Sequence, residues 1–416
     1  MDRKNRRAVS MQTLDSQQEA VWDYIRNRLF LGTTNLVYDC FSSTEQEKRF
    51  DHLPWPDEIA ADFPNPCGWG TGMEDCMLNA GSVIEICRLR SRLRQDPEAE
   101  NFACRIIDGM FACTHVHGTP GFVARGISPR DGKSCYSNSS RDQFTLCVYG
   151  AWNFLRGFPD APEKSRQAAR RILTDIADYC ERSITPAGDY DLMRLDGKPG
   201  RVGKMIHAEC HEELRLPMIY LAAYDVSGEE RFLNHYLSLR ENALNVTRRL
   251  EEKKDWWDIS IGQLQISLDL CGQIDSDTEP EYRQLRASVR EIARRHLENT
   301  LKQVRDFRGD WNRPNSDWRL RPMIQHRDAF DKTRGIVTLF QGKPYLCPVA
   351  DPDYKVPATL LRATGNLLIA LLLGTEHSVP PLAEEAAQVV MKPDFHLHCS
   401  SGGINLLHGI SLLSGR

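Results

Sequence analysis

The sequence lacks a long apolar run. Its longest uninterrupted apolar stretch lies around Leu367–Leu373, far short of the about 20 residues that cross a bilayer. The N-terminus is charged, but no apolar segment follows it as in an export signal. We therefore expect no membrane span, no membrane partner and no export signal.

The sequence also lacks an excess of basic residues. Lys and Arg number 53 and Asp and Glu number 57, which gives a net charge of −4, so nucleic acid is not an expected partner. A glycine-rich phosphate loop, a dinucleotide glycine fingerprint, a Gly-x-Ser-x-Gly elbow and paired Cys-x-x-Cys motifs are all missing. Nucleotide and redox chemistry are therefore disfavoured, and we expect no cofactor.

Cysteine is not scarce, but its number is odd: the chain has 13. Several cysteines stand inside apolar helical patterns, where a reduced thiol behaves as a small apolar side chain. These are Cys76, Cys87, Cys104, Cys147 and Cys271. This usage favours a reducing compartment and a cytoplasmic protein; a periplasmic or secreted location stays open if a signal peptide was removed.

Sustained strand-like alternation is nearly absent. Apolar residues instead return every three or four positions, which is typical of amphipathic helices. This periodicity predicts an all-α protein of about twelve helices, at 17–31, 72–93, 98–115, 140–156, 163–182, 207–225, 229–252, 259–273, 280–304, 356–374, 382–392 and 402–414.

The connections between these helices alternate between short and long. The short ones carry helix-start signals such as Asp96-Pro97-Glu98. The long ones are rich in Gly, Pro, aromatic and basic residues, and loops of such length are uncommon unless they are functional. They span 32–71, 116–139, 183–206 and 305–355. Six helical hairpins with long loops on one side predict an (α/α)6 toroid with its site on one rim.

The toroid changes the expected number of domains. Length alone suggests two or three, at about 150 residues each. The toroid instead predicts one domain over 1–416, with 1–16 as a flexible N-terminal tail. An open α-solenoid is the alternative, but it needs a repeat of fixed period, and the sequence has none.

Two acids stand at the start of the second helix. Glu74 and Asp75 follow a loop that contains Trp69 and three glycines, so their carboxylates are candidates to face a pocket. The alternative is a stabilising role, because acids suit the positive end of a helix dipole and Thr71 with Glu74 matches a capping box. The pattern leaves both roles open.

A polar cluster stands at the start of the fourth helix. Arg141 and Asp142 precede an apolar helical face, and Tyr136 lies shortly before them. Arginine binds carboxylates through paired hydrogen bonds, and aspartate transfers protons when burial adjusts its pKa. We expect Asp142 to be catalytic and Arg141 to hold a substrate carboxylate. A structural ion pair or a cap is the alternative.

The sixth helix begins with two histidines four positions apart. On a helix, His207 and His211 lie one above the other, which is a metal-ligand spacing. The order is not that of the metalloproteases and no third ligand is evident, so we expect no metal. We expect Glu209 and His211 to be catalytic and His207 to bind substrate, with a structural role as the alternative.

The long loops carry further candidates. Aromatic side chains in such loops stack on sugar rings, and scattered cations select acidic sugars. We therefore expect substrate contacts from Trp69, His117, Tyr190, Arg201 and Trp256.

The chain resembles the six-hairpin glycosidases, (α/α)6 carbohydrate-active enzymes that include the unsaturated glucuronyl hydrolases. The resemblance rests on the hairpin layout and on Gly72-Met73-Glu74-Asp75 and Ser140-Arg141-Asp142-Gln143 at alternate helix starts. In the unsaturated glucuronyl hydrolases, an aspartate near an inner-helix start protonates a vinyl ether, to which water then adds. The resemblance implies this role for Asp142, with Asp75 second. The 207–213 segment departs from the family pattern.

These patterns together predict a glycoside hydrolase of acidic, uronic acid-containing oligosaccharides, acting as a monomer or homodimer. Asp142 and one further acid would transfer protons. A polysaccharide lyase on the same toroid is the close alternative, and it would use Tyr136, Tyr190 or His211. A sugar epimerase with two catalytic histidines and a non-catalytic glycan-binding toroid stay open as well.

Overall fold

The computed structural model of the chain describes residues 3–326, 345–374 and 380–415, and within them the side chains of 3–13, Arg201 and His326 lie outside the description. The described residues are mostly helical, at 62% helix, which confirms the predicted all-α class. Their α-helices are α1 (Arg3–Tyr24), α2 (Pro56–Ala60), α3 (Cys76–Arg94), α4 (Pro97–His115), α5 (Arg141–Gly157), α6 (Glu163–Ser183), α7 (Arg215–Ser227), α8 (Glu230–Thr247), α9 (Asp258–Ile274), α10 (Glu279–Asp306), α11 (Pro352–Leu372), α12 (Pro381–Ala387) and α13 (Gly402–Ser414).

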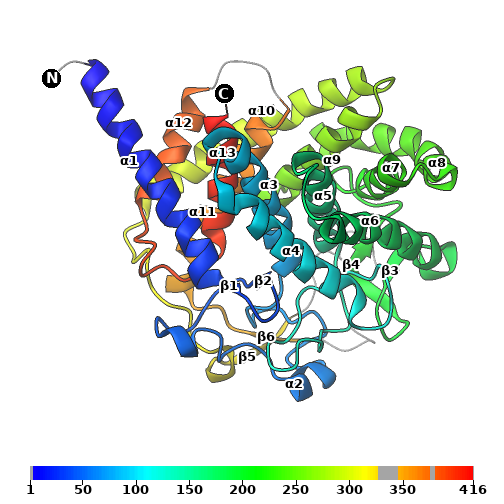
Figure 1. Ribbon diagram of the computed structural model, residues 1–416, viewed down its shortest axis with the longest axis horizontal. Helices are drawn as coiled ribbons and strands as arrows, with labels where there is room; N and C mark the ends of the chain where they lie inside the picture. The colour runs from blue at the N-terminus through cyan, green and yellow to red at the C-terminus, as the bar shows by residue number, and fades with distance from the viewer. Residues whose placement is uncertain (1–2, 327–344, 375–379, 416) are drawn as a thin grey trace.

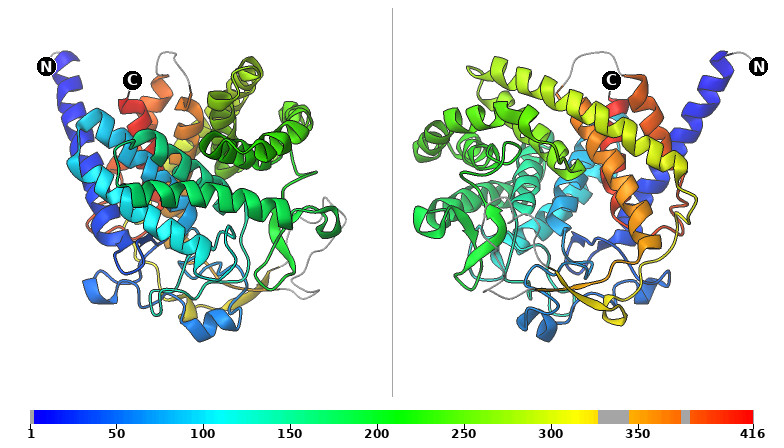
Figure 2. Two further views of the ribbon diagram at one scale, coloured as in Figure 1. Left: turned by 45° about the vertical axis from the view of Figure 1, so that its right-hand side comes forward. Right: turned by 180° about the vertical axis from the view of Figure 1, so that it is seen from behind.

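The few strands form three antiparallel pairs, and all of them except β1 lie inside the long loops. They are β1 (Phe30–Leu31) with β2 (Leu36–Val37), β3 (Asp191–Met193) with β4 (Pro199–Lys204), and β5 (Met323–His326) with β6 (Tyr345–Pro348). In the last pair Met323 lies opposite Pro348 and His326 opposite Tyr345. Figures 1 and 2 show these strands and α2 together at one end of the molecule, so the long loops gather on one side of the helices.

Alternate helices pack against one another. α3 packs on α5, α5 on α7, α7 on α9, α9 on α11, α11 on α13, and α13 on α3. Each of the first five also packs on the helix that follows it, from α4 on α3 to α12 on α11, and α1 packs on α13. One connected cluster of buried apolar side chains runs through the chain from Val21 to Ile410.

Two glycines let α3 and α5 approach closely. A Cβ added at Gly81 would lie 2.2 Å from the carbonyl oxygen of Leu146, and one added at Gly150 would lie 2.7 Å from the Cα of Gly81. No side chain fits at either position. The backbones therefore touch, and this contact fixes where the two helices begin relative to each other.

Within the described part of the chain, one helix is long and apolar enough to cross a bilayer. It is α11, and 67% of its most apolar window is buried inside the protein. Burial of this kind is typical of a core helix.

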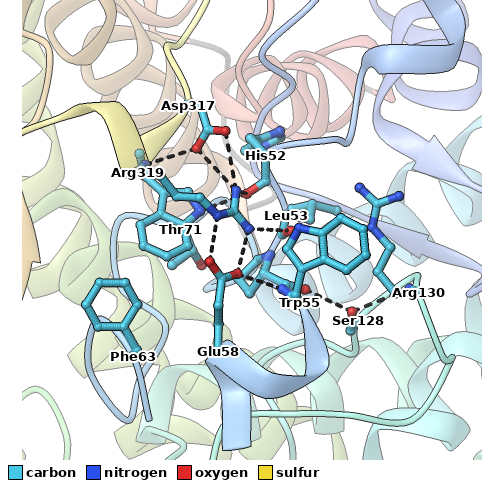
Figure 3. Close-up of polar contacts among 12 residues, drawn as sticks. His52, Leu53, Trp55, Glu58, Phe63, Thr71, Ser128, Arg130, Asp317 and Arg319 are labelled. Atoms are coloured by element: carbon cyan, nitrogen blue, oxygen red, sulfur yellow. Dashed lines mark hydrogen bonds and ion pairs between the residues drawn. The ribbon is translucent and has the colours of Figure 1, made fainter. Parts of the chain in front are cut away.

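An arginine ties the loops at the strand-bearing end together. Arg319 donates to both carboxylate oxygens of Glu58 at 2.6 Å and to the carbonyl oxygens of His52 and Leu53 at 2.9 and 3.2 Å. It also bonds Asp317 at 3.2 Å. Figure 3 shows this guanidinium between the two loop segments. The 32–71 loop and the described residues 305–326 of the later loop are therefore held as one unit.

Four helices begin four or more residues from their predicted starts, and two of them, predicted at 72–93 and 356–374, begin at Cys76 and Pro352. The helix predicted at 17–31 begins at Arg3 and continues beyond Tyr24 as a π-helix, Ile25–Leu29; the flexibility of 1–16 stays a prediction. The helix predicted at 207–225 begins only at Arg215. Glu213 accepts hydrogen bonds from the backbone N–H groups of His207 and Ala208 at 3.1 and 2.6 Å, and His207 has a φ of 58°. These contacts hold the segment in turns.

Candidate active site

A small pocket of about 110 Å³ lies where α3, α11 and α13 meet the loops. Acidic and basic side chains both line it. The acidic ones are Asp39, Glu74 and Asp75, and the basic ones are Arg321, Lys355 and Arg362. Such convergence of opposite charges in a concave site is typical of binding and catalysis.

Asp39 holds the start of α3 in place. Its Oδ2 accepts from the backbone N–H groups of Glu74 and Asp75 at 2.8 and 3.0 Å, and its Oδ1 accepts from Asn79 at 2.9 Å. Burial raises the pKa of Asp39 well above its ordinary value, and the charges of Asp75 and Glu74 raise it further. This carboxyl therefore resists ionisation while its neighbours are charged.

Glu74 is the second acid with a raised pKa. Its Oε2 accepts from the backbone N–H of Gly70 at 2.5 Å. Burial raises the pKa of Glu74 and the charge of Asp75 adds to this, while Lys355 opposes it in part. A raised pKa is the direction of shift that general-acid catalysis by a carboxyl needs.

Asp75 connects α3 to α5. It is the residue before the first turn of α3, and its Oδ1 accepts from Nε2 of Gln143 at 3.0 Å and lies 3.7 Å from Nη1 of Arg125. The same amide of Gln143 donates to the carbonyl oxygen of Glu74 at 3.0 Å. Because the helix begins at Cys76, the predicted capping box of Thr71 and Glu74 is wrong: the Thr71 hydroxyl donates to Gly68 instead.

The first residues of α5 pair with the segment that leads into α7. Asp142 accepts from Nη1 of Arg215 at 2.5 Å, and Arg141 lies 2.5 Å from Glu212. Burial opposes the charge of Glu212, but Arg141 and His211 outweigh it and lower the pKa of Glu212. Arg141 is thus engaged by a protein carboxylate, and the expectation that it holds a substrate carboxylate is not favoured by this pairing.

A second, larger cavity has a volume of about 1010 Å³. It is bounded by the 207–211 turns, the end of α8, the 252–257 segment and the start of α9. Its lining residues are His207, Ala208, Glu209, Cys210, His211, Val246, Arg249, Glu252, Lys253, Lys254, Asp255, Trp256, Trp257, Ser260 and His296.

A row of ionisable side chains begins at Glu212 and continues into the lining of this larger cavity. The Glu212 carboxylate lies 3.5 Å from His211 Nε2, the Glu209 carboxylate lies 3.5 Å from His211 Nδ1, and Lys253 lies 2.6 Å from Glu209. The Trp256 ring makes an edge contact with His211 at 5.7 Å. His207 and His211 stand in turns rather than on one helix face, so the metal-ligand spacing argument is wrong. Among the described residues, no group of three or more His, Cys, Asp or Glu side chains is placed to hold a metal.

Two predicted site residues have partners within the fold. The Tyr136 side chain is 2% exposed and its hydroxyl donates to the carbonyl oxygen of Phe63 at 2.6 Å. Nε2 of His117 lies 3.1 and 3.0 Å from the carbonyl oxygens of Cys113 and Phe122, and burial lowers its pKa. Both environments favour a packing role.

The remaining predicted contacts lie near the two cavities. Tyr190 meets the His207 ring edge-on at 5.1 Å. Trp69 packs against Tyr345 at 5.2 Å, and the Arg125 guanidinium lies over its ring at 5.5 Å. The side chain of the predicted carboxylate-binding residue Arg201 lies outside the described part of the structure.

The predicted catalytic residues therefore form two groups joined by one helix start. Glu74 and Asp75 line the small pocket, and Glu209 and His211 line the larger cavity. Asp142 lines neither, but the residues on either side of it bond to Asp75 and Glu212. The 141–143 segment therefore connects the two groups through a hydrogen bond and an ion pair.

The sequence pattern did not single out several of these residues. Asp39 stands in a loop, 35 positions before the nearest of its partners, and no local signal marks it. Asp258 at the first position of α9 carries the same signal as Glu74, an acid at a helix start beside aromatic residues, and it pairs with Arg362 at 3.2 Å. The basic residues Arg215, Lys253 and Lys355 were also missed.

Comparison with known proteins adds no family. No protein-family model matches the chain, and no curated protein matches it.

Proposed function

We propose that the protein is a glycoside hydrolase of uronic acid-containing oligosaccharides, built on a closed (α/α)6 toroid. The cycle of contacts from α3 through α5, α7, α9, α11 and α13 back to α3 supports the toroid. In such a ring the inner helices begin on one rim, and the long loops, the strands and the small pocket lie together at one end here. The resemblance to six-hairpin glycosidases supports the same proposal.

The small pocket carries the proposal. It brings a carboxyl of raised pKa, Glu74, together with Arg321 and Lys355. Nη2 of Arg321 donates to the carbonyl oxygen of Ser316 at 3.0 Å, and its Nε is buried without a hydrogen-bond partner among the described residues. A uronate carboxylate would pair with Lys355 and Arg321 and place the adjoining glycosidic bond beside Glu74.

Glu74 and Asp142 are the proposed pair for proton transfer. Glu74 donates its proton to the leaving glycosidic oxygen as the bond to the anomeric carbon breaks. Asp142, an ion pair partner of Arg215 at 2.5 Å, takes a proton from the water that attacks that carbon. Two carboxyl groups in contrasting environments are the arrangement that this chemistry needs. Asp75 accepts a hydrogen bond from Gln143, and this bond positions the start of α3 against the start of α5.

The test uses a 4,5-unsaturated uronyl disaccharide, because its double bond absorbs in the ultraviolet. We expect the wild type to remove this absorbance, and Glu74→Gln and Asp142→Asn each to lower kcat/KM by about 10²–10⁴-fold. Azide should restore part of the activity of Asp142→Asn. Glu298→Gln, an exposed acid on α10, is the control and should leave the rate unchanged.

Other outcomes would select the alternatives. New absorbance on an acidic polysaccharide would indicate a lyase, and exchange of a sugar C–H proton with solvent without bond cleavage would indicate an epimerase. Binding that survives all these substitutions without turnover would indicate a glycan-binding protein. Full activity of both Glu74→Gln and Asp142→Asn would refute the proposed pair.

A further inference from the structure

We infer that the larger cavity binds the sugar units of an oligosaccharide that lie beyond the cleaved bond. This inference rests on the proposed function and defines the substrate as a chain rather than a simple uronide. The cavity measures about 1010 Å³, against about 110 Å³ for the small pocket. Ligand cavities usually measure about 300–1,000 Å³, so only the larger one has room for several sugar units.

Two consecutive tryptophans supply an aromatic wall in this cavity. Trp256 is fixed, because its Nε1 donates to the carbonyl oxygen of Lys253 at 3.0 Å and its ring contacts His211. Trp257 also lines the cavity and is 55% exposed. An exposed indole at the edge of a concave site offers a flat apolar face for a sugar ring.

The polar wall of the cavity has an unused hydrogen-bonding group. His211 is 3% exposed, and its Nδ1 has no hydrogen-bond partner among the described residues, since the Glu209 carboxylate lies 3.5 Å away without hydrogen-bond geometry. A buried polar atom without a partner is costly unless a ligand or water completes it. Sugar hydroxyls both donate and accept, and they suit this nitrogen together with the Lys253–Glu209 pair.

A chain of side-chain contacts connects the cavity to the proposed catalytic pair. Its wall residue His211 lies 3.5 Å from Glu212, which pairs with Arg141, the residue before Asp142. A chain whose terminal uronate lies in the small pocket would therefore pass Asp142 and enter the larger cavity. Lys254, which also lines it, provides a cation for a second uronate along the chain.

Calorimetric titration tests this inference in the Glu74→Gln protein, which should not consume its ligand. The probes are a 4,5-unsaturated uronyl disaccharide and the tetrasaccharide of the same repeat. We expect the tetrasaccharide to bind at least about tenfold more tightly than the disaccharide, an advantage typical of a buried aromatic contact. Trp257→Ala should abolish this advantage and leave the affinity for the disaccharide unchanged.

Matched controls separate the outcomes. Trp55→Ala removes a tryptophan that is 47% exposed and lies at the start of α2, and this variant should keep the tetrasaccharide advantage. If Trp257→Ala does not fold, His211→Gln takes its place and should lower that advantage. Equal affinity for both probes, or an advantage that survives Trp257→Ala and His211→Gln, overturns the inference even if the wild type hydrolyses both. If the length-dependent binding is lost in Trp257→Ala but the wild type cleaves neither probe, the inference stands and the proposed hydrolase activity fails.

Discussion

A single guanidinium organises the loops at the site end. Arg319 satisfies one carboxylate with two parallel bonds and two backbone carbonyls from a segment more than 260 positions earlier in the chain. Its side chain is 24% exposed, so these bonds lie in a partly desolvated setting. Arginine suits this position because its guanidinium presents a planar fork of donors, which lysine lacks.

We predict that Arg319→Ala lowers the free energy of unfolding by about 3 kcal/mol, because it removes both guanidinium bonds to the partly buried Glu58 carboxylate and the donor to the Leu53 carbonyl oxygen. Arg319→Lys should recover less than half of this loss, since an ammonium cannot pair with both carboxylate oxygens. Urea unfolding measures both. The exposed Arg295→Ala on α10 is the control, and a similar loss there would show that the effect is only one of charge.

The acids of the small pocket predict a pH dependence of stability. The pKa of Glu74 is raised in the folded state from its ordinary value of 4.5, so the folded state binds more protons than the unfolded state above that pH. The contribution of Glu74 to stability therefore falls as pH rises from 4.5 through the raised pKa. The free energy of unfolding of Glu74→Gln minus that of the wild type should therefore be larger at pH 8 than at pH 4. Urea unfolding at each pH measures this difference. A constant difference would contradict the raised pKa.

At the residue scale, the sequence predicted part of the site. Glu74 and Asp75 were found because acids at a helix start leave a local pattern. Asp39 leaves none, since its role depends on backbone N–H groups 35 and 36 positions away. The prediction of a helix that begins at His207 was wrong, because the Glu213 carboxylate accepts hydrogen bonds from the backbone there. The spacing of apolar residues gives no sign of such a contact.

Among the elements, α3 and α5 carry the most closely packed contact at the site. Gly81→Ala would place a Cβ 2.2 Å from the Leu146 carbonyl oxygen, which is backbone and cannot move without shifting α5. We predict a loss of at least about 3 kcal/mol in the free energy of unfolding. Activity should fall with it, because Glu74 and Asp142 stand at the starts of these helices.

Gly118→Ala provides the comparison for this prediction. Nothing lies within 4 Å of a Cβ at that position, and only its φ of 78° opposes alanine. Its cost should be about 1 kcal/mol, as read from thermal unfolding. Equal losses for the two variants would show that the helix contact is not the cause.

The elements were largely predictable because most of them bury one face. The helices predicted at 98–115, 163–182 and 402–414 lie within two residues of α4, α6 and α13. The hairpin β3–β4 was read as loop. Its strands are short and include Pro199 and glycines, so they carry little of the alternation that marks a strand.

At the scale of the whole molecule, buried histidines set the response to acid. Burial lowers the pKa values of His52, His398 and His408 to about 4, whereas unfolded histidine titrates near 6.5. The unfolded state therefore binds more protons between these values. The contribution of these histidines to stability is complete above pH 6.5 and is lost as pH falls toward 4.

We predict that His408→Leu flattens this acid limb. Both ring nitrogens of His408 are buried without a hydrogen-bond partner in the described part of the chain, so the unfolding free energy at pH 7 should change by less than about 1 kcal/mol. Thermal unfolding between pH 4 and 7 should show a smaller drop than in the wild type. An unchanged slope would mean that burial does not lower the pKa of His408.

The contact between α13 and α3 also bears on how the chain is made. Ser82 bonds Asn405, a residue 323 positions later. At about 5–20 residues per second, roughly 15–65 s separate the synthesis of these two partners. During translation, the face of α3 that α13 covers therefore stays exposed until the last helix leaves the ribosome, and transiently exposed surface of this kind is where misassembly begins.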